Sequence, residues 1–455
     1  MRKNDPFNGK LFALVLPIAA QNLLSALVSA SDALMLGLLD QSSMAAVSLA
    51  AQVQFVLSLF FAALTIGSGV LAAQYWGKGD RDAVESVLMT ALRASVLVAA
   101  GFFLAANFCP ALLMRLLTNE PELITLGVPY LRAASWSYLF MGVSQIYLCI
   151  MKNSGRTLRS TLYGSSALVL NLIFNALLIF GLLGLPRLEI VGAALATSLA
   201  RLAELLLVIA ENFRPEVVRI RWPQRRRPEL RRDFWKYTLP VLGNELVWGC
   251  GVTAYTAIMG RLGSDAVAAN SIANIVLNIV SCVCLGIGNG SGIIVGNELG
   301  RGELALAKEY GSRLYRTSLL AGVISGGVIL AAAPLLTGLN PQMSGTARQY
   351  LWGMLLVCAL NMVGRALNST TVAGIFCAGG DTRFGLLCDT ITTWAVIIPA
   401  GFLTAFVLKL PVLAVFFVLH MDEIVKLPFV YRHYRQYGWV RNLTESNSSL
   451  GGYTT

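Results

Sequence analysis

Few ionisable side chains lie inside the long apolar stretches of this chain, and these are the residues that could do chemistry. Asp32 lies about two-thirds of the way along the first stretch, between small residues. A charged group in a bilayer costs about 3 kcal/mol, so such a residue is a functional candidate by default. A buried carboxylate can take up and release a proton, or bind a cation. The alternative is a carboxylate that neighbouring hydroxyls satisfy for packing alone.

Two pairs of residues could complete a site around Asp32. Asn171 and Asn175 share a helix face at i, i+4, and so do Ala193 and Thr197. Their oxygens are suitable cation ligands, and Na⁺ at Asp32 is the one metal ion that the sequence suggests. On the residues alone, a purely structural role for the two amides is the better interpretation.

A second set of acids lies in the other half of the chain. Glu245, Asp389, Asp422 and Glu423 are candidates for ion coupling there, with Lys426 one turn beyond Glu423. A neutralised structural cluster of Asp422, Glu423 and Lys426 is as good an interpretation, because paired charges are what a bilayer tolerates. Glu245 is the better functional candidate.

Enzymatic motifs are missing from the sequence. It contains no HExxH, GxSxG, kinase or Walker pattern, and its two histidines are His420 and His433. We therefore expect no enzyme and no cofactor, and an energy source in a gradient of H⁺ or Na⁺.

Composition predicts an all-α integral membrane protein. Of 455 residues, 56% are hydrophobic and 13% charged, about half the charged share of a soluble protein. The apolar stretches approach or exceed the roughly 20 residues that cross a bilayer. They predict twelve transmembrane helices, at 11–39, 46–75, 88–117, 127–152, 159–184, 189–211, 234–262, 267–299, 308–338, 346–378, 384–409 and 411–433.

The chain contains an internal repeat of two similar halves. Leu16-Pro17 recurs as Leu239-Pro240, an offset of 223 (240 − 17), and the same offset joins Gly77-Lys78-Gly79-Asp80 to Gly300-Arg301-Gly302-Glu303. With two more residues of offset, Arg201 corresponds to Lys426. Two six-span repeats that start on the same side of the membrane are parallel copies, related by a pseudo-twofold axis along the membrane normal. They predict two six-helix lobes with a cavity between them.

These patterns set the expected domains. Residues 1–211 form an N-lobe, 212–233 a cytoplasmic basic linker, 234–433 a C-lobe and 434–455 a cytoplasmic tail. The net charge of +11 follows the positive-inside rule with both termini cytoplasmic, so we expect no nucleic-acid partner. Anionic lipids would hold the linker. We expect a monomeric, multi-pass protein of the cell membrane.

Two prolines lie inside apolar helices. Pro17 and Pro240 occupy equivalent positions of the repeats, where a missing N–H and a ring clash kink a helix. Bends there could gate the cavity, and a static kink is at least as good an interpretation.

Several of these segments together resemble the multidrug and toxic compound extrusion (MATE) family. They are Asp32 followed by Met35-Leu36-Gly37, the two Gly-rich loops above, Gly379-Gly380-Asp381-Thr382-Arg383 and Gly192-Ala193-Ala194-Leu195-Ala196-Thr197. Residues 239–261 look most like the bacterial damage-inducible-type branch. The resemblance implies a twelve-helix exporter of small, mainly cationic organic molecules in exchange for H⁺ or Na⁺.

The resemblance also implies roles for single residues. Asp32 falls on the family's cation-coupling aspartate, with Asn171, Asn175, Ala193 and Thr197 at its partner positions. Related members have a second acid where this chain has Asn175, so the departure favours protons over Na⁺. The residues expected to line the substrate cavity are Gln21, Met35, Trp248, Tyr255, Asn274 and Asn278. The alternative function is a flippase for lipid-linked precursors or polysaccharides, which should have a groove rich in arginine.

Overall fold

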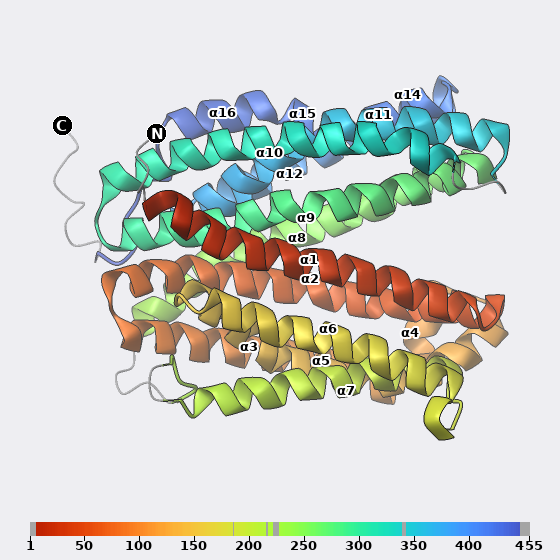
Figure 1. Cartoon of the computed structure of the whole chain (residues 1–455), viewed down its shortest axis with the longest axis horizontal. Coiled ribbons are helices and arrows are strands. Elements are labelled where there is room, and N and C mark those ends of the chain that lie inside the picture. The colour runs from red at the N-terminus through yellow and green to blue at the C-terminus, as the bar shows by residue number, and fades with distance from the viewer. Residues whose placement is uncertain (1–5, 185, 215–216, 222–226, 339–342, 446–455) are drawn as a thin grey trace. The chain divides into compact units, whose positions relative to one another are not determined.

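The structure is a computed structural model, and it describes residues 6–184, 186–214, 217–221, 227–338 and 343–445. These residues form helices and their connections, with no strand among them (Figure 1). Helices suit an apolar chain because each satisfies its own backbone hydrogen bonds, which a bilayer cannot do.

The first repeat contains six membrane-crossing segments. The helices are α1 (Pro6–Gly37), α2 (Gln41–Lys78), α3 (Arg81–Phe108), α4 (Pro110–Leu117), α5 (Pro121–Asn153), α6 (Thr157–Phe180) and α7 (Glu189–Asn212), with a single 3₁₀ turn, η1 (Leu182–Gly184), after α6. The prediction of one span over 88–117 was wrong. Asp80 caps α3 by accepting from Ala83 N, so the helix begins at Arg81, seven residues before the predicted start. Pro110 begins a separate helix because proline suits a first turn.

The second repeat has more irregular helices, several of them short or π-helical. It contains α8 (Pro228–Gly260), α9 (Ser264–Gly300), α10 (Leu304–Gly338), α11 (Gly345–Asn368) with π-helical η2 (Ser369–Phe376), α12 (Thr382–Thr390), η3 (Ile391–Ile397), α13 (Ile398–Phe402), η4 (Leu403–Val407), α14 (Val412–Leu419), α15 (Asp422–Val425) and α16 (Leu427–Arg435). The stretch from α12 to η4 is one continuous rod, whereas α14 to α16 form a broken one.

Ten helices of the described part are long and apolar enough to cross a membrane. Helix α8, 33 residues long, and the rod from α14 to α16 bring the spans to twelve. The predicted fold class, an all-α membrane protein of twelve spans in two six-helix lobes, is confirmed.

Contacts divide the chain into two compact units. One comprises residues 23–72 and 80–238, and the other comprises 1–22, 73–79 and 239–455. The first turns of α1 belong to the second unit because they pack against glycines of α9: a Cβ on Gly286 would lie 3.0 Å from the Ala19 Cβ. The proposed lobe boundaries near 211 and 234 follow the sequence repeat, whereas these units follow the packing.

Equivalent glycines of the two repeats make reciprocal contacts. Gly77 leaves no room for a Cβ against the Asn297 carbonyl, and Gly300 leaves none against the Gln74 carbonyl. Each of these two pairs maps onto the other at the repeat offset of 223. The duplication thus explains why both loops need glycine at this position.

The C-terminal segment is packed up to Glu445. Trp439 is fully buried in a cluster with Phe7 and Tyr310. Gln74 donates to the carbonyls of Ala378 and Arg441, at 2.7 and 3.1 Å, and accepts from Leu443 N. The part of the expected tail that is described is therefore an integral part of the fold.

Candidate functional site

The structure brings the five N-lobe candidates into one chain of hydrogen bonds. Asn175 Nδ2 donates to Asp32 Oδ1 at 2.6 Å and lies 3.3 Å from Asn171 Oδ1. Asn171 Nδ2 donates to Thr197 Oγ1 at 3.1 Å, and Thr197 donates to the Ala193 carbonyl at 3.1 Å. These hydrogen bonds connect α1 to α6 and α7, which lie far from α1 in the sequence.

One oxygen of this chain has no partner. Asn171 and Asn175 are 9% and 2% exposed, and the buried Asn175 Oδ1 accepts no hydrogen bond from any described residue. A buried acceptor without a donor costs about 1–3 kcal/mol, so such groups need an explanation. The site therefore offers one carboxylate, two amide oxygens and one hydroxyl to a proton or a small cation.

Packing holds this site in place. Ala193 and Ala194 belong to a core cluster with Val47, Tyr130 and Ile179, and Met35 and Leu36 of α1 pack against it. Asp32 is one turn before Met35, so the cluster fixes the second half of α1 against α6 and α7. Met35, expected to line the cavity, is partly buried and packs against this core cluster.

The C-lobe acids also form a cluster, centred on a lysine. Lys426 Nζ lies 2.9 Å from Asp389 Oδ1 and 3.1 Å from Glu423 Oε2. Asn368 Nδ2 donates to the carbonyl and to Oε2 of Glu423, both at 2.7 Å. Asp422 and Arg365 lie within electrostatic range of Glu423. Of the predicted cluster, Glu423 pairs with Lys426 and Asp389 joins it, whereas Asp422 forms no ion pair among the described residues.

The remaining candidates are spread over α1, α8 and α9. Glu245 is half-buried on α8, within electrostatic range of Asp389. Trp248 and Asn278 are exposed and Gln21 is half-buried. Asn274 donates to Asn270 Oδ1 at 3.2 Å, whereas Tyr255 packs against a core cluster of α9 and α11. Pro17 and Pro240 lie inside α1 and α8, which both continue through them.

No metal site is formed by His, Cys, Asp and Glu side chains alone in the described ranges, where no three of them are grouped suitably. A Na⁺ ion at Asp32 would instead need the oxygens of Asn171, Asn175 and Thr197. The unpaired Asn175 oxygen fits that use, whereas the amide NH₂ that Asn175 turns toward Asp32 is not a cation ligand.

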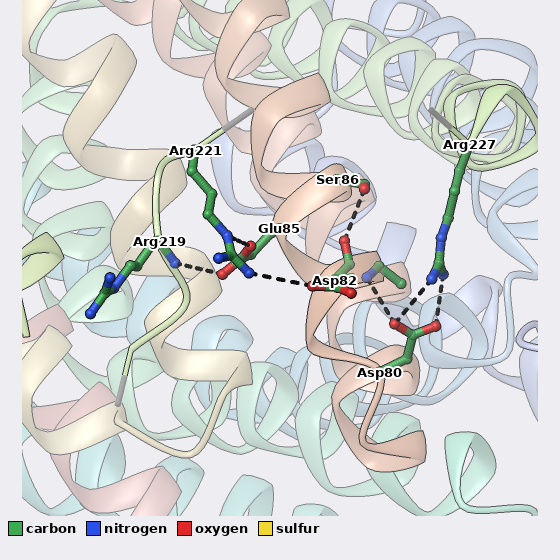
Figure 2. A network of polar contacts seen from close by, with 8 residues as sticks. Asp80, Asp82, Glu85, Ser86, Arg219, Arg221 and Arg227 are labelled. Atoms are coloured by element: carbon green, nitrogen blue, oxygen red, sulfur yellow. Dashed lines mark hydrogen bonds and ion pairs between the residues drawn. The ribbon is translucent and has the colours of Figure 1, made fainter. Parts of the chain in front are cut away.

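Two arginines of the basic linker, Arg221 and Arg227, are paired with acids at the start of α3. Figure 2 shows Arg221 bound to Glu85 and, at 3.4 Å, to Asp82, while Arg227 bonds Asp80 at 2.7 Å. The Glu85 carboxylate raises the pKa of Arg221 above its ordinary value. These two arginines are therefore held by the first turn of α3 rather than left for lipid; Arg225 and Arg226 lie outside the described residues.

Two buried acids of α7 escaped the sequence reasoning. Glu204 is fully buried, accepts from Ser144 and pairs with Arg201 at 2.7 Å. Glu211, 1% exposed, is bound by Arg156, Arg159 and Arg214. The signal was available, since Ala193, Thr197, Glu204 and Glu211 recur at helical spacing along α7.

Comparisons with known proteins agree with this geometry. The MatE family model matches residues 17–177 and 240–403, and the two matches begin 223 residues apart (240 − 17), the offset of the sequence repeat. The "Uncharacterized transporter YisQ" of Bacillus subtilis (strain 168) is 21% identical over 440 residues, covering 95% of each chain. A "Probable multidrug resistance protein NorM" of Bradyrhizobium diazoefficiens is 26% identical over 416 residues, covering 86% of this chain and 85% of that one.

A solved structure shares the whole fold. It is described as the outward-facing conformation of a multidrug resistance MATE family transporter, and it matches with a TM-score of 0.87 at 17% identity over 96% of both chains. The damage-inducible-type branch remains a prediction. The two matches to the family model, with the twelve-span fold, establish that this multi-pass membrane protein belongs to the MatE family, the multidrug and toxic compound extrusion transporters.

Proposed function

We propose that this chain is a secondary active exporter of small, mainly cationic organic molecules, driven by antiport with H⁺ at Asp32. The observation that carries the proposal is the hydrogen bond from Asn175 to Asp32 on a buried chain of polar groups. Relatives named for multidrug resistance support the substrate class. In this proposal the transporter lies in the cell membrane with both termini cytoplasmic, and it acts as a monomer.

Protonation of Asp32 changes the strength of a specific bond. Hydrogen bonds to an ionised carboxylate are roughly twice as strong as those between neutral groups. A proton on Asp32 therefore weakens its hold on Asn175, and the second half of α1 loses its polar attachment to α6. The helix α1 then bends at Pro17, which lies closer to its N-terminal end, and repacks. This repacking couples proton binding to the change between inward- and outward-open forms.

One contact supports the proposal of H⁺ rather than Na⁺ as the coupling ion. Asn175 presents its NH₂ group to Asp32, and a cation between them would meet amide hydrogens rather than oxygens. Turning the amide would expose Oδ1, so Na⁺ is the second candidate. The flippase alternative needs a groove rich in arginine. It loses support because Arg201, one of the few arginines inside a span of this chain, is paired with Glu204.

Purified protein in liposomes tests the proposal. A pH gradient should drive uptake of a fluorescent organic cation by the wild-type protein, and Asp32→Asn should abolish it. Asp40→Asn is the matched control, because Asp40 is an exposed acid in the turn after α1, where it caps α2 through Ser43. Normal uptake by Asp32→Asn would refute the proposal, as would lipid scrambling without any gradient.

A further inference from the structure

A lysine ammonium lies between two acids inside the C-lobe. Asp389 comes from α12, Glu423 from α15, and Lys426 follows α15, so three segments meet at one nitrogen. The side chains of Lys426, Asp389 and Glu423 are 11, 17 and 20% exposed. Neighbouring carboxylates in such surroundings are stable only with a cation close by, since water no longer screens them.

The cluster carries the oxygen ligands of a cation site. Asn368, 5% exposed, donates to the carbonyl and to Oε2 of Glu423, while its own Oδ1 is buried and accepts nothing from the described residues. Carboxylate and amide oxygens are hard ligands of the kind that binds small cations. Between the carboxylates of Asp389 and Glu423 lies the Lys426 ammonium.

The first repeat has a basic side chain at the equivalent position. Arg201 corresponds to Lys426 at the later repeat offset of 225 (426 − 201), and it pairs with Glu204 three residues away. Both repeats therefore neutralise a buried acid from the same place in their last span. The second repeat differs in bringing a further acid, Asp389, to the same basic group.

We infer that the Lys426 ammonium is a tethered cation, held where a free Na⁺ or K⁺ ion would otherwise bind between Asp389 and Glu423. Asp389 and Glu423 then have a cationic partner without any mobile ion, and the exchanged ion is left to Asp32. The inference rests on the proposed function only in this last assignment. Asp422 and Arg365 also lie within electrostatic range of this cluster, and a substitution of Lys426 leaves both of these residues unchanged in the sequence.

Replacing Lys426 by an uncharged side chain of similar length tests this directly. Lys426→Met should acquire a saturable rise in melting temperature with NaCl or KCl, relative to N-methylglucamine chloride of equal ionic strength. The measurement is made in an Asp32→Asn background, which removes the N-lobe response. Adding Asp389→Asn should abolish the gain. Lys308→Met, at an exposed position of α10, is the charge-matched control and should show no gain. A folded Lys426→Met without any cation response overturns the inference.

A second measurement applies even if Lys426→Met does not fold. With Lys426 present, Asp389→Asn should leave the cation response of the otherwise wild-type protein unchanged. Loss of that response would show that a mobile ion uses the C-lobe acids, and would overturn the inference. Drug transport that survives Asp32→Asn would instead refute the proposed function, so the two failures are distinguishable.

Discussion

The amide nitrogen of Asn175 lies 2.6 Å from a carboxylate oxygen of Asp32, across 143 residues of sequence. This contact joins α1 to α6 through one charge-assisted bond. Its strength depends on whether Asp32 is ionised, and on that dependence the proposed coupling rests.

Asn175→Asp should turn the site toward Na⁺. The change places a second carboxylate beside Asp32, and two ionised carboxylates at this distance need a cation or a shared proton. We expect transport by the variant to become stimulated by Na⁺ at neutral pH, whereas wild-type transport follows the pH gradient alone. Uptake measured with separate pH and Na⁺ gradients checks this. Asn175→Leu, which offers no oxygen, should lose transport under both gradients.

Gly77→Ala should destabilise the protein. Its added methyl group would overlap the Asn297 carbonyl, a backbone atom that cannot move aside cheaply. Overpacking of this kind costs about 1–3 kcal/mol. Thermal unfolding in detergent measures it, with Gly101→Ala as control, because a Cβ on Gly101 meets open space. Equal melting temperatures for the two variants would contradict the close packing of α2 on α9.

Trp439→Ala should be strongly destabilising although the residue lies beyond the last membrane-crossing helix. The ring is fully buried against Tyr434 and Gly311, and removing a buried tryptophan costs about 3–5 kcal/mol. A melting temperature close to that of the wild type would mean that the segment after α16 is not integral to the fold. Trp235→Ala, half-buried near the start of α8, should cost less.

Asp40 should contribute stability that disappears in acid. Its carboxylate accepts from the Ser43 backbone N–H at 2.7 Å, which lowers the pKa of Asp40 below its ordinary value. A lowered pKa stabilises the folded state above the unfolded pKa of about 3.9, and the contribution is lost as the pH falls below that value. The stability difference between wild type and Asp40→Asn should therefore be constant from pH 7 to 5 and shrink progressively as the pH falls below about 4. A difference that grows as the pH falls below about 4 would contradict the contact.

Sequence patterns predicted the twelve spans well because hydropathy and the need for internal backbone bonding leave few alternatives. The repeat offset of 223 paired Gly77 with Gly300 as equivalent positions, but their contacts with Asn297 and Gln74 follow only from the packing. Residue spacing could place Asn171 and Asn175 on one face of α6, but not orient them toward Asp32, which depends on how α1 packs. The helical spacing of Glu204 and Glu211 could have marked them as buried, but not their pairing with Ser144 of α5 or with Arg156 just before α6, which depends on helix packing.

The contacts of the basic linker and of the C-terminal tail also depend on tertiary packing. The basic linker was expected to face lipid, yet Arg221 and Arg227 are bound by the acids that open α3 (Figure 2). Tail residues such as Trp439 have no periodic pattern, so their burial follows only from the tertiary fold.

Proton counting on purified protein tests the central claim most directly. Binding of a cationic substrate to the wild-type protein in weakly buffered solution should release close to one proton per molecule near neutral pH, and Asp32→Asn should release none while Asp40→Asn behaves as wild type. Equal proton release by wild type and Asp32→Asn would contradict coupling at Asp32.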